Sequence, residues 1–541
     1  MNFKNIFALG LLLLCVDCSI HAQQISKPPA STVQASVGYN NIPLMKRMPF
    51  NPFLWINIAV PENKAVTYKS IQLQLDENAL KAIEKIDIVL RDLTKRGFLE
   101  GATFLASVKP KSAVINIPID VTFKQGLNYI SVSIVLKDDA NIDKKINVKA
   151  NYITESNGIK QHFVRTRVFT KDRILTVPAN YISKLETRVG IAIRKKGDDS
   201  VNTYRIPGMI TTNKGTLIAV YDIRYNSSRD LPGNIDVGMS RSTDGGHTWE
   251  PMKVIMDMGV PNENNGVGDP AVLFDPVTKK LWVAALWSKG NRSIAGSEPG
   301  LSPDTTGQLV LASSDDDGVT WSQPYSITKQ VKDPKWHLYF NGPGAGITMQ
   351  NGTLVFASQY WDETKKPGIP HSSIIYSEDH GKTWKSGTGA KSNTTEAQVV
   401  ETTPGTLMLN MRDNGGNFRS VATTTNMGKT WIEHQTSFME FIDPIAMASF
   451  IKARVNLKGK MKDVLFFCNV ASETRRRNTT IKASLDLGET WWAQNELLID
   501  IRTTAGYSDI TKIDENTLGV LYEGDNGELY FLRIPVSDIL K

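Results

Sequence analysis

A pattern of eight residues, S-x-D-x-G-x-T-W, recurs along the second half of this 541-residue chain. The third positions of successive copies lie between 47 and 72 residues apart, which is enough chain for one four-stranded sheet with its loops. The pattern has the chemistry of a tight hairpin, because the Asp can accept hydrogen bonds from turn amides, the Gly permits a positive φ and the Trp can pack beneath the loop. Complete copies begin at Ser242, Ser314, Ser377 and Ser484, and a degenerate copy with Asn426 in place of the Asp begins at Thr424.

This repeat constrains the fold of residues 186–541. Four-stranded sheets that are repeated around an axis make a β-propeller. At roughly 60 residues a sheet, the region has room for about six blades, one of them without the repeat. We therefore predict a six-bladed β-propeller over 186–541. We assign the repeated Asp residues to turn formation rather than to catalysis.

The residues before the propeller alternate between apolar and polar side chains, which is typical of strands with one buried face. The clearest runs are 66–75, 113–123 and 129–136. Only 79–86 has a helical pattern, and the polar, proline-bearing residues 24–50 favour a linker or an edge segment. We predict a β-sandwich domain over 23–185, so that the whole chain is all-β.

The first 22 residues have the layout of a signal peptide. Lys4 precedes an apolar run over 7–16, and polar residues then lead to a cleavage position after Ala22. The run is too short to span a bilayer comfortably, so cleavage is favoured over a membrane anchor. Cys15 and Cys18 would allow a lipoprotein, although neither directly follows the small residue that lipidation needs. We expect an exported protein of the periplasm, the cell surface or the medium, with no transmembrane segment after cleavage.

The cysteine and histidine content argues against a disulfide framework or a metal centre. Once the signal peptide is removed, Cys468 is the one cysteine left, so it can form neither an internal disulfide nor a cysteine-based metal site. The seven histidines show no ligand spacing, and the chain has no phosphate loop or dinucleotide motif. We expect no cofactor, no metal and no nucleic-acid partner.

An ordered series of short segments, rich in arginine, carboxylate and tyrosine residues, is interleaved with the repeats. The segments are Tyr204-Arg205-Ile206-Pro207, Arg224 with Asp230, Gly268-Asp269-Pro270, Gly342-Pro-Gly-Ala-Gly-Ile347, Thr395-Glu396, Leu409-Asn-Met-Arg412, Arg475-Arg476-Arg477, Gly506-Tyr507-Ser508 and Leu521-Tyr522-Glu523. Each segment is unspecific alone, but their order and their interleaving with the repeats are specific. Together they resemble the bacterial exo-sialidase (neuraminidase) family with Asp-box repeats, over roughly residues 190–541.

The resemblance implies an exo-α-sialidase that acts as a retaining glycoside hydrolase. In such an enzyme Tyr507 corresponds to the nucleophile, Glu396 to its partner base and Asp230 to the acid/base residue. Asp222 and Asp236 are nearby carboxylates that could be confused with Asp230. Without the ordered pattern, Tyr507 would be read as a core tyrosine and Asp230 as a turn residue.

The resemblance also implies a set of substrate-binding residues. Arg205, Arg412 and Arg476 correspond to a triad around the sialic acid carboxylate, with Arg477 as the alternative third member because the run of arginines leaves the register open. Arg224 and Asp269 correspond to residues that shape the site floor or bind the 4-hydroxyl. Glu523 corresponds to the carboxylate that holds Arg205.

Elementary chemistry explains these residue types. Planar guanidinium groups bind a carboxylate through paired hydrogen bonds and stay charged. A carboxylate nucleophile would be repelled by the substrate's own carboxylate, whereas a tyrosine is neutral until it is deprotonated. Because the pKa of a tyrosine is ordinarily about 10, it needs a base. Sialidases are a known tyrosine exception among glycosidases.

Two other functions stay open beside hydrolysis. One is a trans-sialidase, including the intramolecular kind, and the other is a non-catalytic Asp-box propeller that binds glycans. A hydrolase would act on sialylated oligosaccharides, on glycoproteins such as mucins and on glycolipids such as gangliosides. The basic N-terminal region has 23 Lys and Arg against 13 Asp and Glu over 23–185. We expect this domain to be a carbohydrate-binding module, and the alternative is a structural domain packed against the propeller.

Overall fold

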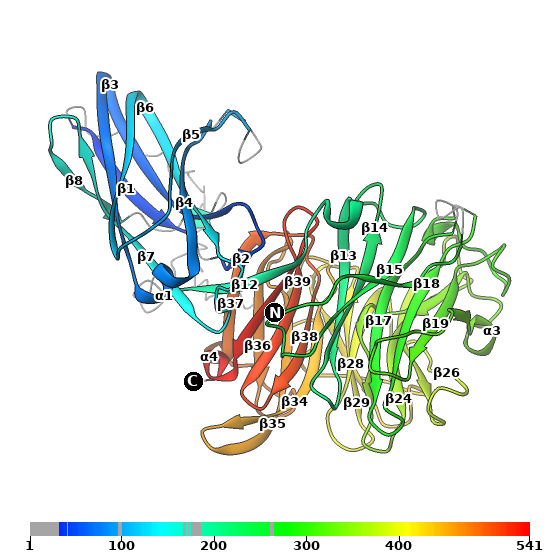
Figure 1. The fold of residues 1–541 in the computed structure, drawn as a ribbon. Coiled ribbons are helices and arrows are strands. Elements are labelled where there is room, and N and C mark those ends of the chain that lie inside the picture. Colours follow the sequence, from blue (N-terminus) through cyan, green and yellow to red (C-terminus); the bar gives the residue numbers. More distant parts are fainter. Residues whose placement is uncertain are drawn as a thin grey trace, which may run out of the picture.

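The computed structural model describes residues 32–40, 42–92, 94–95, 100–165, 169–170, 173–174, 186–259, 265–290 and 292–540. The predicted signal peptide lies outside the described residues. The chain is all-β, with a smaller N-terminal domain beside a propeller-like ring of sheets (Figure 1). The α-helices in the described part are short: α1 (Glu77–Ala82), α3 (Thr328–Val331) and α4 (Val536–Ile539).

Two long strands organise the N-terminal domain. Strand β3 (Asn51–Leu75) pairs antiparallel with β6 (Val114–Leu136) along most of its length, and alternate residues such as Ile56, Ile71 and Ile130 are fully buried. The other strands are β1 (Gln34–Tyr39), β2 (Leu44–Lys46), β4 (Ile83–Leu90), β5 (Thr103–Val108), β7 (Lys145–Glu155), β8 (Lys160–His162), β9 (Val164–Arg165), β10 (Phe169–Thr170) and β11 (Arg173–Ile174).

Local predictions for this domain needed correction in two places. The predicted strands 113–123 and 129–136 are one strand, β6, because residues on both sides of Gly126 pair with β3, with a register shift at that point. Of the residues 79–86 with a helical pattern, only those up to Ala82 are helical, because Ile83 is already extended and pairs with β6. The segment 24–50, predicted as a linker or an edge segment, contains strands β1 and β2, and β1 pairs with β3.

Five sheets in the described part of the chain stand around a common axis (Figure 1). The first has β13 (Thr203–Thr211), β14 (Leu217–Arg224), β15 (Ile235–Ser242) and β16 (Lys253–Met256). The second has β17 (Val267–Asp275), β18 (Lys280–Trp287), β19 (Gln308–Ser314), β20 (Tyr325–Ser326) and β22 (Gly344–Ala345). The third has β21 (Leu338–Asn341), β23 (Ile347–Thr348), β24 (Leu354–Trp361), β25 (Pro370–Ser377), β26 (Lys385–Ser386) and β27 (Lys391–Ser392).

The fourth sheet has β28 (Thr394–Glu401), β29 (Leu407–Asp413), β31 (Ser420–Thr424) and β32 (Ile432–Glu433), beside the small pair β30 (Asn417–Phe418) and β33 (Ile442–Asp443). The fifth has β34 (Ser449–Leu457), β35 (Lys460–Val470), β36 (Arg477–Ser484) and β37 (Glu496–Thr503). Buried apolar residues of neighbouring sheets form shared clusters, for example the one that includes Val237 of the first sheet and Val283 of the second.

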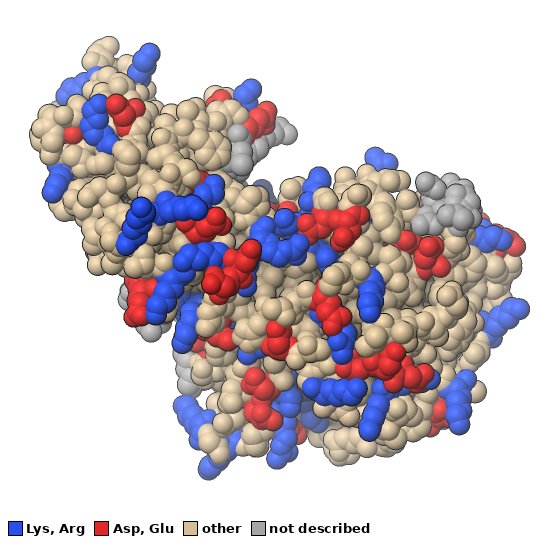
Figure 2. Space-filling model, in the orientation of Figure 1, with Lys and Arg blue, Asp and Glu red and all other residues tan. Residues whose placement is uncertain are grey.

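The ring and the N-terminal domain share one strand. The C-terminal strands β38 (Ser508–Asp514), β39 (Thr517–Glu523) and β40 (Leu529–Pro535) pair in order, and β40 then pairs with β12 (Glu186–Arg194). Strand β12 also pairs with β7 and with β2 of the N-terminal domain. Ion pairs also connect the N-terminal domain to the ring, such as the one between Arg533 Nε and Asp143 Oδ1 at 2.6 Å. Figure 2 shows acidic and basic side chains intermixed on the face of the molecule that it draws.

The repeated motif forms the predicted hairpin turn in each of the five sheets. In the copy that begins at Ser314, Asp316 Oδ1 accepts hydrogen bonds from Ser314 Oγ and Thr320 N, both at 2.8 Å. Gly318 has φ 84°, and Trp321 Nε1 donates to the carbonyl of Gly318 at 3.3 Å. The bond from the Thr amide to the Asp or Asn side chain recurs in the other four copies, which confirms that these residues form turns. The bond from the Trp indole to the Gly carbonyl recurs in the copies that begin at Ser242 and Ser484.

Replacing Asp316 by Asn should leave the fold intact at neutral pH and make it less sensitive to acid. Hydrogen bonds from the Thr320 hydroxyl and amide lower the pKa of Asp316 to about 2. Because this folded pKa lies below the ordinary value of about 4, the carboxylate adds stability at higher pH that is lost as the pH falls towards 2. Asn426 already fills the equivalent position and accepts from Thr430 N at 3.0 Å. Thermal unfolding across this pH range checks the expectation, and an acid-induced loss equal to that of the parent would contradict it.

Candidate active site

The predicted site residues gather at one end of the ring. Arg205 and Asp269 lie near the beginnings of β13 and β17, and Glu396 lies near the beginning of β28. Tyr507 directly precedes β38, and Glu523 ends the neighbouring strand β39. Since the first strand of each sheet runs in the same sense along the axis, residues that are far apart in sequence meet here.

A tyrosine, a glutamate and an arginine form the centre of this cluster. Tyr507 Oη donates to Glu396, with its two carboxylate oxygens at 2.6 and 2.7 Å. Arg412 Nη1 donates to Glu396 Oε2 at 2.5 Å and to Tyr507 Oη at 2.9 Å. Burial and the negative charge of Glu396 raise the pKa of Tyr507 well above 10, although the nearby arginines oppose this rise. At neutral pH the phenol is therefore protonated, with its proton directed at Glu396.

Two further arginines lie against the ring of Tyr507. The guanidinium carbons of Arg205 and Arg476 are 5.2 and 5.4 Å from the ring centroid. Arg205 Nε donates to Glu523 Oε1 at 2.9 Å, and the other oxygen of Glu523 accepts from Tyr507 N at 2.8 Å. Burial alone would lower the pKa of Arg205, but Glu523 and Tyr507 outweigh it and raise that pKa. Three guanidinium groups thus converge around one phenol, a suitable environment for a bound carboxylate.

The geometry decides between Arg476 and Arg477 as the third arginine of the cluster, a choice that the sequence alone left open. Arg476 donates from Nη1 to the carbonyl of Ala505 at 2.8 Å and from Nη2 to the carbonyl of Ile445 at 2.9 Å. Gly506 has φ 104°, and a Cβ there would lie 2.7 Å from Arg476 Cδ. Arg477 instead begins β36 and pairs with Thr503. It is therefore Arg476 that reaches Tyr507.

Asp230 lies at the edge of the cluster, beside Arg224 and Arg205. Its Oδ1 is 2.7 Å from Arg224 Nη1 and 3.8 Å from Arg205 Nη1, and its side chain is 65% exposed. Burial of the carboxyl opposes a lower pKa, but Arg224 and Arg205 prevail and lower the pKa of Asp230. The next residue, Leu231, is buried in an apolar cluster with Phe340, which anchors the loop that carries Asp230.

The two carboxylates that could be confused with Asp230 are both buried. Asp222 accepts from Arg224 Nη2 at 2.8 Å and from Asp269 N at 2.8 Å, so it holds two predicted site residues in place. Asp236 accepts from the Tyr225 hydroxyl at 3.0 Å. Burial and the charges of Asp222 and Glu396 raise the pKa of Asp269. The supporting role of Asp222 was missed, although its i, i+2 spacing to Arg224 on a strand places both side chains on one face.

Left-handed backbone conformations also cluster here. Ile206, Asp269 and Ile445 have φ values of 58°, 57° and 61°. Such angles are costly for a residue other than glycine, and most of all for a β-branched one. Residues held this way tend to lie at functional sites, and the residue types of Ile206 and Ile445 do not predict such a conformation.

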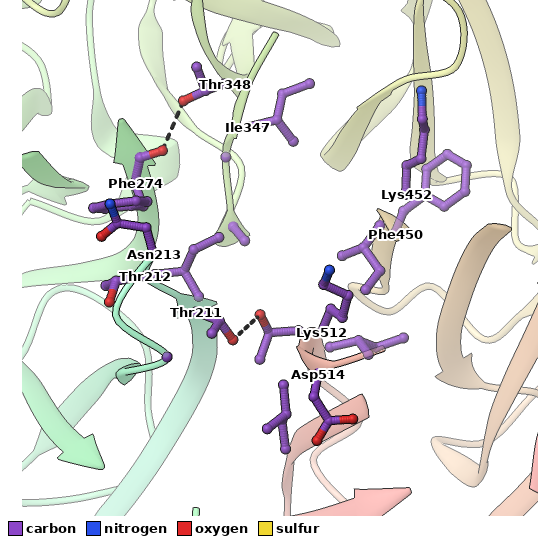
Figure 3. Close-up of a pocket in the computed structure, with 18 of the residues that line it drawn as sticks. Thr211, Thr212, Asn213, Phe274, Ile347, Thr348, Phe450, Lys452, Lys512 and Asp514 are labelled. Carbon is purple, nitrogen blue, oxygen red and sulfur yellow. Dashed lines mark hydrogen bonds between the residues drawn. The ribbon is translucent and has the colours of Figure 1, made fainter. Parts of the chain in front are cut away.

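A separate pocket of about 510 Å³ lies at the opposite end of the ring (Figure 3). Thr211, at the end of β13, hydrogen-bonds to Thr511 there at 2.9 Å, whereas Arg205 lies near the start of the same strand. Lys452 and Lys512 also line this pocket, and no predicted site residue does. Among the described residues, no group of three or more His, Cys, Asp or Glu side chains is arranged to hold a metal ion. No helix in the same part of the chain is long and apolar enough to cross a membrane.

Comparison with known proteins identifies the family. Residues 206–525 match the BNR repeat-like domain. A sialidase of Bacteroides fragilis is 40% identical over 564 aligned residues, which cover 98% of each chain. The chain belongs to the sialidase family. A sialidase of Micromonospora viridifaciens is 32% identical over 62% of this chain and 52% of its own.

Solved structures agree with this family. The Hadza microbial sialidase Hz136 is 37% identical, with a TM-score of 0.84 over 93% of this sialidase and 100% of that chain. The intramolecular trans-sialidase from Ruminococcus gnavus has 18% identity and a TM-score of 0.54, over 63% of this chain and 96% of that one. At that identity, the likeness shows a shared fold alone.

Proposed function

We propose that this sialidase is an exo-α-sialidase that hydrolyses terminal sialic acid from glycans by a retaining, double-displacement mechanism. The observation that supports it best is the hydrogen bond from Tyr507 Oη to both oxygens of Glu396, in the midst of Arg205, Arg412 and Arg476. A glycan-binding propeller without catalysis would have no need to pair a buried phenol with a carboxylate base.

In the first step, the three arginines hold the substrate carboxylate, and the anomeric carbon lies over Tyr507 Oη. Glu396 takes the phenolic proton as the tyrosine oxygen attacks, while Asp230 protonates the departing glycosidic oxygen. In the second step, Asp230 removes a proton from water, which attacks the anomeric carbon. The bond to Tyr507 breaks, and Tyr507 recovers its proton from Glu396. Two inversions retain the configuration of the sugar.

Arg224, Asp269 and Glu523 take supporting roles in this proposal. Arg224 and Asp269 bind the 4-hydroxyl or shape the floor of the site, and Glu523 holds Arg205. The expected substrates are sialylated oligosaccharides, mucins and other glycoproteins, and gangliosides. The similarity to the Bacteroides fragilis sialidase, which extends over nearly the whole chain, supports a hydrolytic sialidase of bacterial type.

We extend the proposal to the domains and the location of the protein. Strands β38, β39, β40 and β12 would act as a sixth blade, because they pair in this order and β38 contacts both β13 of the first sheet and β34 of the fifth. Residues 23–185 would form a carbohydrate-binding β-sandwich, and residues 1–22 a signal peptide that directs export to the periplasm, the cell surface or the medium.

The experiment that tests the function is the release of free sialic acid from sialyl-lactose by the purified protein. Free sialic acid as the product would support hydrolysis. An anhydro-sugar would indicate an intramolecular trans-sialidase, and sialic acid moved to an added acceptor glycan would indicate an intermolecular one. No turnover by a folded protein that still binds sialic acid would indicate a glycan-binding propeller.

The pH dependence of catalysis should differ between kcat and kcat/KM. In the free protein, Arg224 and Arg205 keep the pKa of Asp230 below its ordinary value, so the acid form is scarce at neutral pH. A substrate carboxylate on Arg205 cancels part of that positive charge and raises the pKa of Asp230. Since kcat/KM reports the free enzyme and kcat the complex, the alkaline limb of kcat should lie at higher pH. If the alkaline limbs of kcat and of kcat/KM for sialyl-lactose lay at the same pH, this expectation would be contradicted.

A further inference from the structure

A buried charged pair lies behind the arginine cluster. Arg419 and Asp443 are 0% and 1% exposed, so neither can touch a bound glycan. Arg419 Nη1 lies 3.5 Å from Asp443 Oδ2, and Arg419 Nε donates to Asn410 Oδ1 at 2.5 Å. Asn410 is two residues before Arg412 on β29, so both side chains are on one face of that strand.

The pair holds the turn over 443–447 through the backbone of Ala446, because one member binds the carbonyl of that residue and the other binds its amide. Arg419 Nη1 donates to the carbonyl of Ala446 at 2.5 Å, and Asp443 Oδ1 accepts from Ala446 N at 2.8 Å. Asn469 Nδ2 donates to the other oxygen of Asp443 at 3.2 Å. Hydrogen bonds to charged groups in a buried site are among the stronger ones, so Ala446 is firmly placed.

This turn contacts the active site at two points. The carbonyl of Ile445 accepts from Arg476 Nη2 at 2.9 Å, and Met447 packs with Ile206 and Tyr507. Ile445 has φ 61°, a conformation that an isoleucine keeps only where its surroundings hold it. The hydrogen bonds of the next residue, Ala446, supply that restraint.

We propose that Arg419 and Asp443 are positioning residues that aim Arg476 at the sialic acid carboxylate through the strained carbonyl of Ile445. The inference deepens the proposed function and rests on it, because it takes Arg476 to be a carboxylate ligand. Without the pair, Ile445 relaxes, and the guanidinium of Arg476 keeps its hydrogen bond to Ala505 and its contact with the Tyr507 ring but loses its hydrogen bond to Ile445. The carboxylate is present in both the ground state and the transition state, so KM changes more than kcat.

The first test compares Arg419→Met with Arg194→Met. Arg194 is also buried, and it donates to Tyr221 Oη and Ser240 Oγ rather than to the turn that holds Arg476. Losing one fixed hydrogen bond of a charged group should raise KM about tenfold in Arg419→Met, with a smaller change in kcat. The control should keep the KM of the parent. An unchanged KM in Arg419→Met, or an equal rise in the control, would overturn the proposal.

A double variant, Arg419→Met with Asp443→Asn, separates positioning from stability. Removing both charges avoids an unpaired buried carboxylate, so the double variant should fold even where the single one does not. Its KM should still be raised. Calorimetry with free sialic acid and with its methyl ester gives a second readout, because only the free acid should bind more weakly. Equal weakening of both ligands would overturn the proposal. Sialic acid binding without hydrolysis by the parent would instead count against the proposed function, and the binding comparison would still decide the positioning role.

Discussion

Tyr507→Phe should abolish the release of sialic acid from sialyl-lactose almost completely, with kcat lower by on the order of 10⁴-fold. The substitution removes the attacking oxygen and the proton that Glu396 accepts. The aromatic ring and its contacts with Ile206 and Met447 stay, and so do the three arginines. KM should therefore change far less than kcat.

Tyr522→Phe is the matched control for this variant. Tyr522 is also a buried tyrosine whose hydroxyl donates to a carboxylate, Asp500 Oδ2 at 2.9 Å, but it lies outside the cluster. It should keep most of the parent activity. Steady-state kinetics and thermal unfolding of both variants make the comparison. Activity that survives in Tyr507→Phe would leave a sialidase in place and assign its nucleophile to another residue.

Asp230→Asn should lower kcat/KM for sialyl-lactose by roughly 10²- to 10⁴-fold, the usual contribution of a general acid. A sugar leaving group needs a proton, whereas an aryl group with a low pKa leaves without one. The loss should therefore be much smaller for an aryl sialoside in the first step. The ion pair with Arg224 also weakens, but Asp222 continues to hold that guanidinium.

Asp236→Asn serves as the control for the acid/base assignment. Burial raises the pKa of Asp236 to about 7, with a further contribution from Asp257, so an amide resembles its protonated form. This variant should hydrolyse both substrates as the parent does. An equal loss on sialyl-lactose and on the aryl sialoside in Asp230→Asn would remove Asp230 from the role of general acid.

The sequence was sufficient to predict the hairpin turns and the propeller-like ring, because the S-x-D-x-G-x-T-W pattern is a local signal. Each Asp bonds to residues within four positions of itself, as Asp316 does with Ser314 and Thr320. By contrast, the pairing of β12 with both β7 and β40 could not be predicted, since it joins segments from opposite parts of the chain. The number of blades and the sandwich form of the N-terminal domain stay predictions.

For the site, the ordered motifs were sufficient to name the side chains that the structure brings together. They were not sufficient to choose within Arg475-Arg476-Arg477, because that choice depends on where β36 begins and on the space that Gly506 leaves. The left-handed conformation of Ile445 and the burial of Arg419 could not be predicted from the sequence either. Both depend on contacts with β29, β33 and β35, and an isoleucine gives no sign of positive φ.

The contact between Arg205 and Glu523 spans 318 residues, and Glu523 also binds the amide of Tyr507. Contacts between such distant residues form late in folding, since the chain must first overcome a large loop-closure entropy. The sheets themselves depend on hairpins, which form quickly. During refolding from denaturant, the circular dichroism of the strands should therefore return before hydrolytic activity. The lag between the two signals would measure the time that the last strands take to dock against the first.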